Sequence, residues 1–199
     1  MQSMMLRSFI AVEVPAEIQN AIAHSLASLQ KVLPRPLVRW VAPQNVHLTL
    51  KFLGDISPAN IERMADTLRI EADAHAPFSM SVGGLGAFPT SRRVRVIWIG
   101  LQAPPSLLVL QRGVEATSAR LGYATEERSF SPHLTIGRVG QNVTAADLQK
   151  IRTALEGTKV GDLGTVNVDA IHIFKSDLRP GGSVYTHLYA LPMRSQNQG

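Results

Sequence analysis

The sequence predicts an α+β protein of two lobes related by a pseudo-twofold axis, each with a mainly antiparallel sheet and outer helices around a central cleft. Strand-like and helix-like segments recur in a similar order in both halves, with no low-complexity linker between them. Short turns join successive strands, which favours antiparallel pairing. The tetrapeptides HLTL (47–50) and HLTI (133–136) repeat one pattern 86 positions apart (133 − 47), each on a strand followed by a helix.

Local patterns place the elements of the first half. Four apolar residues at helical spacing between Ile18 and Leu29 indicate an amphipathic helix, and Ser57-Pro58 supplies an N-cap and a first helical proline. Segments rich in β-branched and aromatic residues indicate strands. The expected elements are a strand at 8–14, a helix at 16–33, extended segments at 38–43 and 45–54, a helix at 59–75 and a strand at 78–89.

The second half follows the same logic. A helix begins after Pro104-Pro105 and stops at Gly122, and another runs from an N-cap at Thr144 to Gly157. The expected strands lie at 93–101, 129–139, 165–178 and 183–193, the last two joined by the turn RPGG at 179–182. We expect one bilobal domain over residues 1–193, with one motif per lobe, and a disordered tail at 194–199.

Composition limits the class of protein. The chain has 199 residues, 45% of them hydrophobic, and a formal charge of +5. Arg92, Arg93 and Arg95 lie close together in the sequence. Two further arginines, Arg35 and Arg39, flank the segment 36–38. This basic excess permits a polyanionic partner, although a solvated basic face is the simpler explanation.

The chain contains no cysteine, which excludes disulfides, thiolate zinc sites and a cysteine nucleophile. The N-terminus is interrupted by charge and is not a convincing signal peptide, and the longest uncharged run, 96–111, is too short and too rich in Gly and Pro to span a bilayer. We therefore expect a soluble, cytoplasmic, monomeric protein with no protein partner implied.

Strand alternation places His with Thr in each motif. In 45–53, His47, Thr49 and Lys51 share one face, and the apolar set that includes Leu48, Leu50 and Phe52 faces the core. Likewise His133 and Thr135 point away from Leu134 and Ile136. Two imidazoles can act as acid and base in an in-line displacement at phosphorus, while the hydroxyls bind the non-bridging oxygens. Such chemistry requires no metal.

A lone histidine on a strand is more often a surface or core residue, so one copy of the motif would be weak evidence. Two copies among six histidines are much less expected by chance. The other four histidines form no rival site, since none has a Thr two residues on. The sequence also lacks HExxH, a P-loop and a dinucleotide fingerprint.

The two motifs resemble the HxTx signatures of the 2H phosphoesterase superfamily. The flanking segments RWVAPQNVHLTLKFLGDI, GGLGAFPTSRRVRVIWIGL, FSPHLTIGRV and FKSDLRPGGSVYTHL are similar to its RNA 2′,3′-cyclic phosphodiesterase branch, also named 2′-5′ RNA ligases. The resemblance spans nearly the whole chain. It implies a bilobal fold and opening of RNA 2′,3′-cyclic phosphates to 2′-phosphates without metal or other cofactor.

By the same resemblance, His47 donates a proton to the departing 3′ oxygen and His133 activates water. Thr49, Thr135 and Arg138 then hold the phosphate. Phe52 and Phe130 are candidates to pack near a base. Strict alternation puts Arg138 and Phe52 on the face opposite the histidines, unless a bulge at Gly137 and the strand end at Gly54 turn them round.

Two alternatives remain at this level. The same histidines can run the reaction in reverse as a 2′-5′ RNA ligase. A non-catalytic nucleotide- or RNA-binding module would instead use the cleft and the basic patch, with binding that weakens steeply in salt.

Overall fold

The computed structural model describes residues 5–90, 93–179 and 182–194. The strands are β1 (Leu6–Glu13), β2 (Val38–Trp40), β3 (His47–Ile56), β4 (Phe78–Phe88), β5 (Val96–Gln102), β6 (His133–Val139), β7 (Asp162–Val168), β8 (Ala170–Arg179) and β9 (Gly182–Pro192). The helices are α1 (Ala16–Val32), α2 (Pro58–Asp73), α3 (Pro105–Arg120) and α4 (Ala145–Glu156), with a 3-10 turn η1 at Pro43–Asn45.

The strands form one nine-stranded antiparallel sheet, whose two sides meet at one registered residue pair. Their order is β7-β4-β5-β6-β3-β1-β8-β9, with β2 added alongside β6. Between the central strands β3 and β6, the only registered pair is Leu48 with Leu134. The pairings within each side are continuous and antiparallel. The α+β fold class with mainly antiparallel strands is therefore confirmed, and the two expected sheets are joined into one through β3 and β6.

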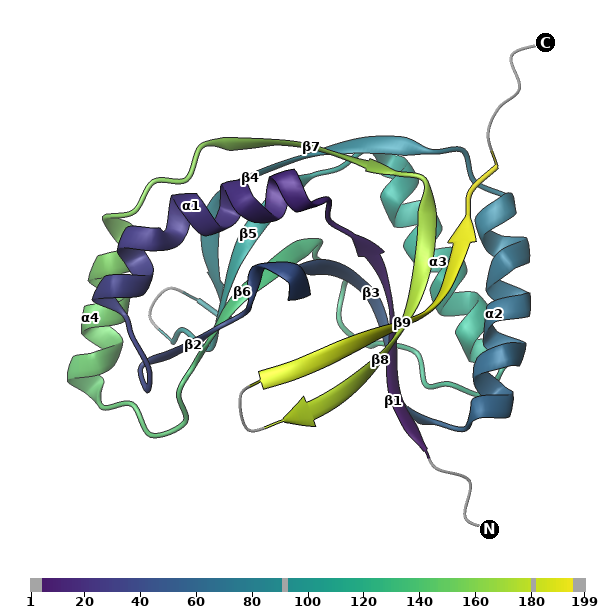
Figure 1. The fold of residues 1–199 in the computed structure, drawn as a ribbon, viewed down its shortest axis with the longest axis horizontal. Coiled ribbons are helices and arrows are strands. Elements are labelled where there is room, and N and C mark those ends of the chain that lie inside the picture. Colours follow the sequence, from purple (N-terminus) through teal and green to yellow (C-terminus); the bar gives the residue numbers. More distant parts are fainter. Residues whose placement is uncertain (1–4, 91–92, 180–181, 195–199) are drawn as a thin grey trace.

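We call β3, β1, β8 and β9 with α2 and α3 the His47 lobe. The His133 lobe is β6, β5, β4, β7 and β2 with α1 and α4. Figure 1 shows α2 and α3 together on one side of the molecule and α1 and α4 on the other.

The lobes are not the two contiguous halves of the chain. The elements of the first half have counterparts in the second half in the same order. The matched pairs are β1 with β5, α1 with α3, β3 with β6, α2 with α4 and β4 with β8. In each matched pair, one member lies in each lobe, so every lobe contains elements from both halves. This interlacing ties the two repeats together.

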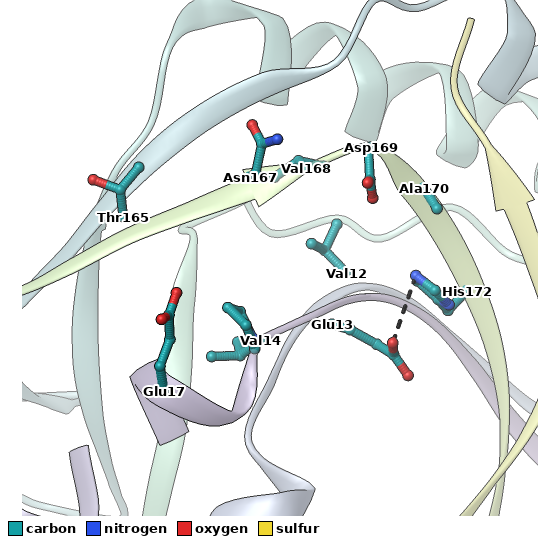
Figure 2. Close-up of a pocket in the computed structure, with 11 residues that line it drawn as sticks. Val12, Glu13, Val14, Glu17, Thr165, Asn167, Val168, Asp169, Ala170 and His172 are labelled. Carbon is teal, nitrogen blue, oxygen red and sulfur yellow. Dashed lines mark ion pairs between the residues drawn. The ribbon is translucent and has the colours of Figure 1, made fainter. Parts of the chain in front are cut away.

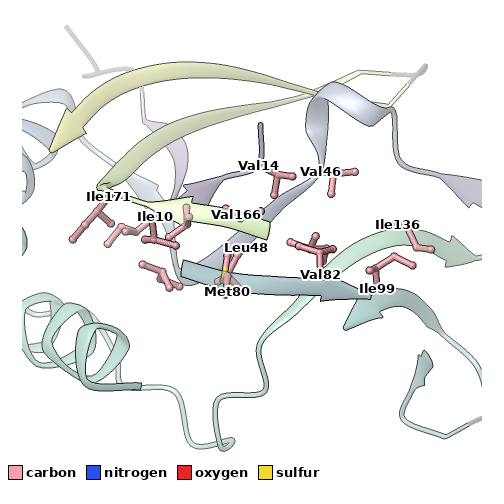
Figure 3. Packing of buried hydrophobic residues seen from close by; sticks show 14 of the residues in the cluster. Ile10, Val14, Val46, Leu48, Met80, Val82, Ile99, Ile136, Val166 and Ile171 are labelled. Atoms are coloured by element: carbon pink, nitrogen blue, oxygen red, sulfur yellow. The ribbon is translucent and has the colours of Figure 1, made fainter. Parts of the chain in front are cut away.

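A shared hydrophobic core lies under both sides of the sheet. It contains residues from β1, β3, β4, β5, β6, β7 and β8, among them Ile10, Leu48, Met80, Ile99 and Ile171 (Figure 3). A second, smaller cluster of Phe9, Ala11 and Phe174 lies on the other face of β1, so this central strand is buried on both sides.

The helix boundaries follow the local signals in the sequence. Ser57 accepts a hydrogen bond from the Asn60 backbone N–H at 3.3 Å, and Thr144 forms a capping box with Asp147. Gly122 has a φ of 89°, which permits the turn after α3. Both predicted N-caps are confirmed.

The single strand expected at 165–178 is wrong. Residues up to Val168 form β7, which pairs with β4, and residues from Ala170 form β8, which pairs with β1 in the other lobe. The buried residues Val166 and Val168 are two apart, but the next buried residue, Ile171, is three further on. This change of phase at Asp169 marks the crossing between lobes.

Three predictions concern residues outside the described ranges or near their edges. Arg92 of the basic patch, Pro180-Gly181 of the last turn and the tail from 195 onwards are outside them. Arg194 is described, and its backbone N–H donates to the His75 carbonyl at 3.1 Å. Among the described residues, no helix has the length and apolar character needed to cross a membrane.

Lys51 is not on the face of the histidines, contrary to strict alternation. It lies opposite Ile10, on the core side, and its side chain is 4% exposed. Its ammonium donates to Glu115 Oε1 at 2.6 Å and to the Ala124 carbonyl at 2.8 Å. Glu115 also accepts from the Glu126 backbone N–H at 2.7 Å, so this pair joins β3 to α3 and to the loop that precedes β6.

We expect Glu115→Ala to lower the free energy of unfolding by about 3–5 kcal/mol, because it leaves the buried Lys51 charge unpaired. The measurement is the midpoint of urea unfolding at constant slope. The exposed pair of Arg69 and Asp66 supplies the matched control, and Asp66→Ala should cost no more than about 1 kcal/mol. Equal losses in the two variants would contradict the assignment. The double variant Lys51→Met/Glu115→Leu should recover most of the stability.

Candidate active site

The two motifs lie side by side where the lobes meet. Extending the Leu48–Leu134 register by one residue each way sets His47 opposite Thr135 and Thr49 opposite His133. The four polar side chains alternate with the buried Leu48 and Leu134, so they share the face of the sheet opposite the main hydrophobic core, which we call the cleft face. The histidines are diagonal neighbours, a relation that gives about 7–8 Å between positions on paired strands.

Both imidazoles are held in the same tautomer. His47 Nδ1 lies 2.7 Å from the Asn45 carbonyl, and His133 Nδ1 lies 2.7 Å from the Ser131 carbonyl. A carbonyl oxygen can only accept, so Nδ1 carries the hydrogen in both rings. Nε2 is thus left without a hydrogen-bond partner from the described part of the chain and is available to a ligand.

The support of His47 extends to the C-terminal hairpin. The Asn45 side-chain amide donates to the Ser183 carbonyl of β9 at 2.8 Å. Asn45 therefore connects β9 to the imidazole that its own carbonyl orients.

Bulges at matching positions turn two further residues towards the cleft. In β3 the pairing with β1 skips Leu50, and in β6 the pairing with β5 skips Ile136. Each skipped residue is the last of its tetrapeptide, and each bulge reverses the alternation that follows. Phe52 and Arg138, both five residues after the motif histidine, consequently lie on the cleft face.

Independent contacts agree with these placements. The Phe52 ring lies 6.2 Å from the Phe9 ring, which stacks on His47 at 4.7 Å. The positive charge of Arg138 acts on the pKa of His47, so its guanidinium lies near that ring. On β2, Arg39 pairs directly with Arg138 and shares its face, which brings a second guanidinium to this wall.

Aromatic rings surround each imidazole. His47 stacks on Phe9 at 4.7 Å and meets Tyr185 at right angles at 5.2 Å, and these two rings also contact each other at 5.0 Å. Phe88 meets His133 edge-on at 4.9 Å and also contacts Trp98. Sequence reasoning did not identify these rings as site residues. Alternation along β1 does place Phe9 on the same face as Ala11 and Glu13, so the pattern could have indicated Phe9.

Phe130 is placed differently from Phe52. It is half-buried against the main hydrophobic core, and no aromatic ring among the described residues contacts it. The structure thus places His47, His133, Thr49, Thr135, Arg138 and Phe52 on one face, whereas the proximity of Phe130 to this face stays a prediction.

The two histidines differ in electrostatic environment. Burial lowers the pKa of His47 below its ordinary 6.5, the Asn45 hydrogen bond opposes that shift, and the charge of Arg138 adds to it. In the free protein at pH 7, His47 is therefore mainly neutral, with the lone pair of Nε2 directed to the cleft.

A junction of two lobes that presents two histidines, two threonines and an arginine on one face is the arrangement expected of a phosphoesterase of the two-histidine class. The model of the LigT like Phosphoesterase family matches the chain twice, over residues 12–98 and 99–185. The chain belongs to this family, and the double match corresponds to the two interlaced repeats.

Curated relatives share this family. The RNA 2′,3′-cyclic phosphodiesterase of Methanothermobacter thermautotrophicus is 30% identical over 185 residues, covering 93% of this chain and 97% of that protein. The protein of the same name from Escherichia coli is 36% identical over 135 residues, covering 66% and 71%. Neither name refers to a ligase, so the ligase alternative is not favoured.

Solved structures agree. The crystal structure of E. coli LigT complexed with 3′-AMP has a TM-score of 0.73 and 27% identity, covering 95% of this chain and 98% of that one. TT0787 of Thermus thermophilus has a TM-score of 0.76 and 25% identity, covering 96% and 100%. These similarities support the fold, and the names of the curated relatives support a hydrolytic enzyme rather than a non-catalytic binding module.

We expect Arg138→Gln to raise the pKa of His47, because removing a nearby positive charge favours the protonated ring. A titration followed by NMR of the ring nitrogens measures this directly. Arg120→Gln, at the end of α3, is the matched control and should leave the His47 pKa unchanged. An unchanged value in Arg138→Gln would place the guanidinium away from the cleft.

Proposed function

We propose that the protein hydrolyses RNA ends that carry a 2′,3′-cyclic phosphate and leaves a 2′-phosphate, by two-histidine acid–base catalysis without a metal ion. The observation that carries the proposal is the matched pair of imidazoles, each with Nδ1–H held by a carbonyl two residues earlier and Nε2 available in the cleft. The names of the curated relatives support the substrate class.

The reaction needs two proton transfers on opposite sides of one phosphorus. Water attacks in line with the 3′ oxygen, His133 Nε2 accepts the proton of the water, and protonated His47 donates from Nε2 to the departing 3′ oxygen. The bond from phosphorus to the 3′ oxygen breaks as the bond to water forms. Diagonal placement across the Leu48–Leu134 pair leaves room for the phosphate between the rings.

The remaining cleft residues would stabilise charge and position the nucleotide. The hydroxyls of Thr49 and Thr135 would donate to the non-bridging oxygens, whose negative charge grows in the transition state. Arg138 would contribute a full positive charge from the same face, with Arg39 beside it. Phe52, which is 64% exposed, offers an apolar surface for a base.

His47 must be protonated to act as the donor, yet burial and Arg138 lower its pKa in the free protein. A bound phosphate is anionic and favours the charged imidazole, so substrate binding would restore the proton. The lowered pKa therefore tunes His47 to release its proton readily once the phosphate occupies the cleft.

With an oligonucleotide that ends in a 2′,3′-cyclic phosphate, we expect His47→Ala and His133→Ala each to reduce kcat by about 10²–10⁴-fold. Activity of the unaltered protein should survive EDTA, and the product should carry a 2′-phosphate. His24→Ala, an exposed histidine of α1, is the control and should keep full activity. Full activity in both motif variants would overturn the proposal.

A substrate with sulfur in place of the 3′ bridging oxygen separates donor from acceptor. A thiolate leaves without protonation because thiols ionise near pH 8.5, far more readily than alcohols. We expect this substrate to rescue His47→Ala much more than His133→Ala. The reverse pattern would exchange the two roles while leaving the two-histidine mechanism intact.

A further inference from the structure

Outside the catalytic junction, the chain carries another pair of histidines in direct contact. His172 Nδ1 lies 2.8 Å from His187 Nε2, between strands β8 and β9. His172 Nε2 lies 3.9 Å from Glu13 Oε2 on β1, the contact drawn in Figure 2. One ligand atom from each of these three side chains lies within 4.8 Å of the other two.

The sheet register explains how the three side chains meet. His172 pairs with Ala11 on β1, and both point to the cleft face, as Glu13 does two residues on. The pairing of β8 with β9 skips Leu188, so His187 pairs with Phe174 and turns to the same face. Without this bulge, His187 would not reach His172.

We propose that Glu13, His172 and His187 form a binding site for a divalent transition-metal ion of the zinc class. Two imidazoles and a carboxylate are a ligand set that zinc takes in proteins, with a further position left open. By the Irving–Williams order, the same ligands would bind Cu²⁺ more tightly than Zn²⁺, and imidazole ligands also suit Ni²⁺.

The geometry needs small adjustments to accept the ion. Tetrahedral zinc, at about 2.0–2.1 Å from each nitrogen, holds two nitrogens about 3.3 Å apart, so the rings must open slightly from their hydrogen-bonded distance. One N–H now lies between the rings. The donor ring moves that proton to its other nitrogen, and both facing lone pairs then become available. The Glu13 carboxylate, on a flexible and 54% exposed side chain, can close the remaining gap.

The surroundings favour a cation. Glu13 and His172 line a cavity of about 380 Å³ that is also lined by Glu17, Asn167 and Asp169 (Figure 2). These carboxylates gather negative charge locally in a chain whose formal net charge is +5.

The site adjoins the proposed catalytic residues, since Glu13 pairs with His47 between β1 and β3, but it shares no ligand with them. Its ligands come from β1, β8 and β9, and an ion there would bridge three strands of the His47 lobe, including the edge strand β9. An ion that binds only the folded chain raises its stability by mass action. The metal should therefore raise the melting temperature, whereas hydrolysis should still proceed in EDTA.

The test uses the full chain without a polyhistidine tag, stripped with EDTA and then titrated with Co²⁺ or Zn²⁺. We expect one ion per chain, a Co²⁺ absorption spectrum of nitrogen and oxygen ligation, and a rise in melting temperature with Zn²⁺. His187→Ala, His172→Ala and Glu13→Gln should each weaken binding at least about tenfold. His187 and Glu13 are exposed, so their variants keep the fold testable.

Two controls locate the site. His75→Ala removes a histidine that also contacts a glutamate, with Nε2 2.8 Å from Glu71 Oε1 but without a second histidine, and should bind like the unaltered chain. His47→Ala should also retain the metal. Binding that survives both His172→Ala and His187→Ala, or that disappears in His47→Ala, would overturn the assignment. Weak binding shared equally by all variants would overturn it as well.

Discussion

The contact between β3 and β6 determines the architecture of the active site. Because these strands share only the pair Leu48 and Leu134, each lobe can keep its own side of the sheet while the two motifs touch. A longer ladder would merge the strands into one flat surface and close the space between their polar side chains. No contact at all would leave each histidine with only the threonine of its own strand. One buried leucine pair therefore sets both the separation of the imidazoles and the opening between them.

The bulges at Leu50 and Ile136 add the second constraint. Each inserts one residue directly after a threonine, so the strand presents His and Thr to the cleft, then two consecutive residues to the core, then another cleft residue. The inward pair is Leu50 and Lys51 in one lobe, and Ile136 and Gly137 in the other. The shared geometry carries different chemistry, because the residue returned to the cleft is Phe52 on one side and Arg138 on the other. The duplication thus places a histidine at equivalent positions in both lobes, but a phenylalanine and an arginine at the next equivalent positions.

Sequence periodicity could predict the elements, the N-caps at Ser57 and Thr144, and the shared face of His47 with Thr49, because these depend on neighbours a few residues away. It could not predict the orientation of Lys51 or Phe52, since a bulge is visible only in the pairing with another strand. The sequence also did not predict that the chain passes between lobes. The spacing of buried residues does change at Asp169, where the chain passes from β7 in one lobe to β8 in the other. The family resemblance pointed to Arg138, but only the register explains how its side chain reaches the cleft. Phe9 and Tyr185 were missed because they reach His47 only through strand pairings distant in sequence, β1 with β3 and β9 with β8.

The asymmetry between the two imidazoles follows from the same packing. His47 is enclosed by Phe9 and Tyr185 and sees Arg138, so its environment resists a positive charge until an anion arrives. Such a group is a weak donor in the empty cleft and a strong one beside a phosphate, since an acid of low pKa gives up its proton with a greater driving force. The ring is nevertheless kept in one tautomer by Asn45, which is itself held by the backbone of β9. In the proposed mechanism, the C-terminal hairpin would therefore help to position the proton donor His47, because the Ser183 carbonyl holds the side chain of Asn45.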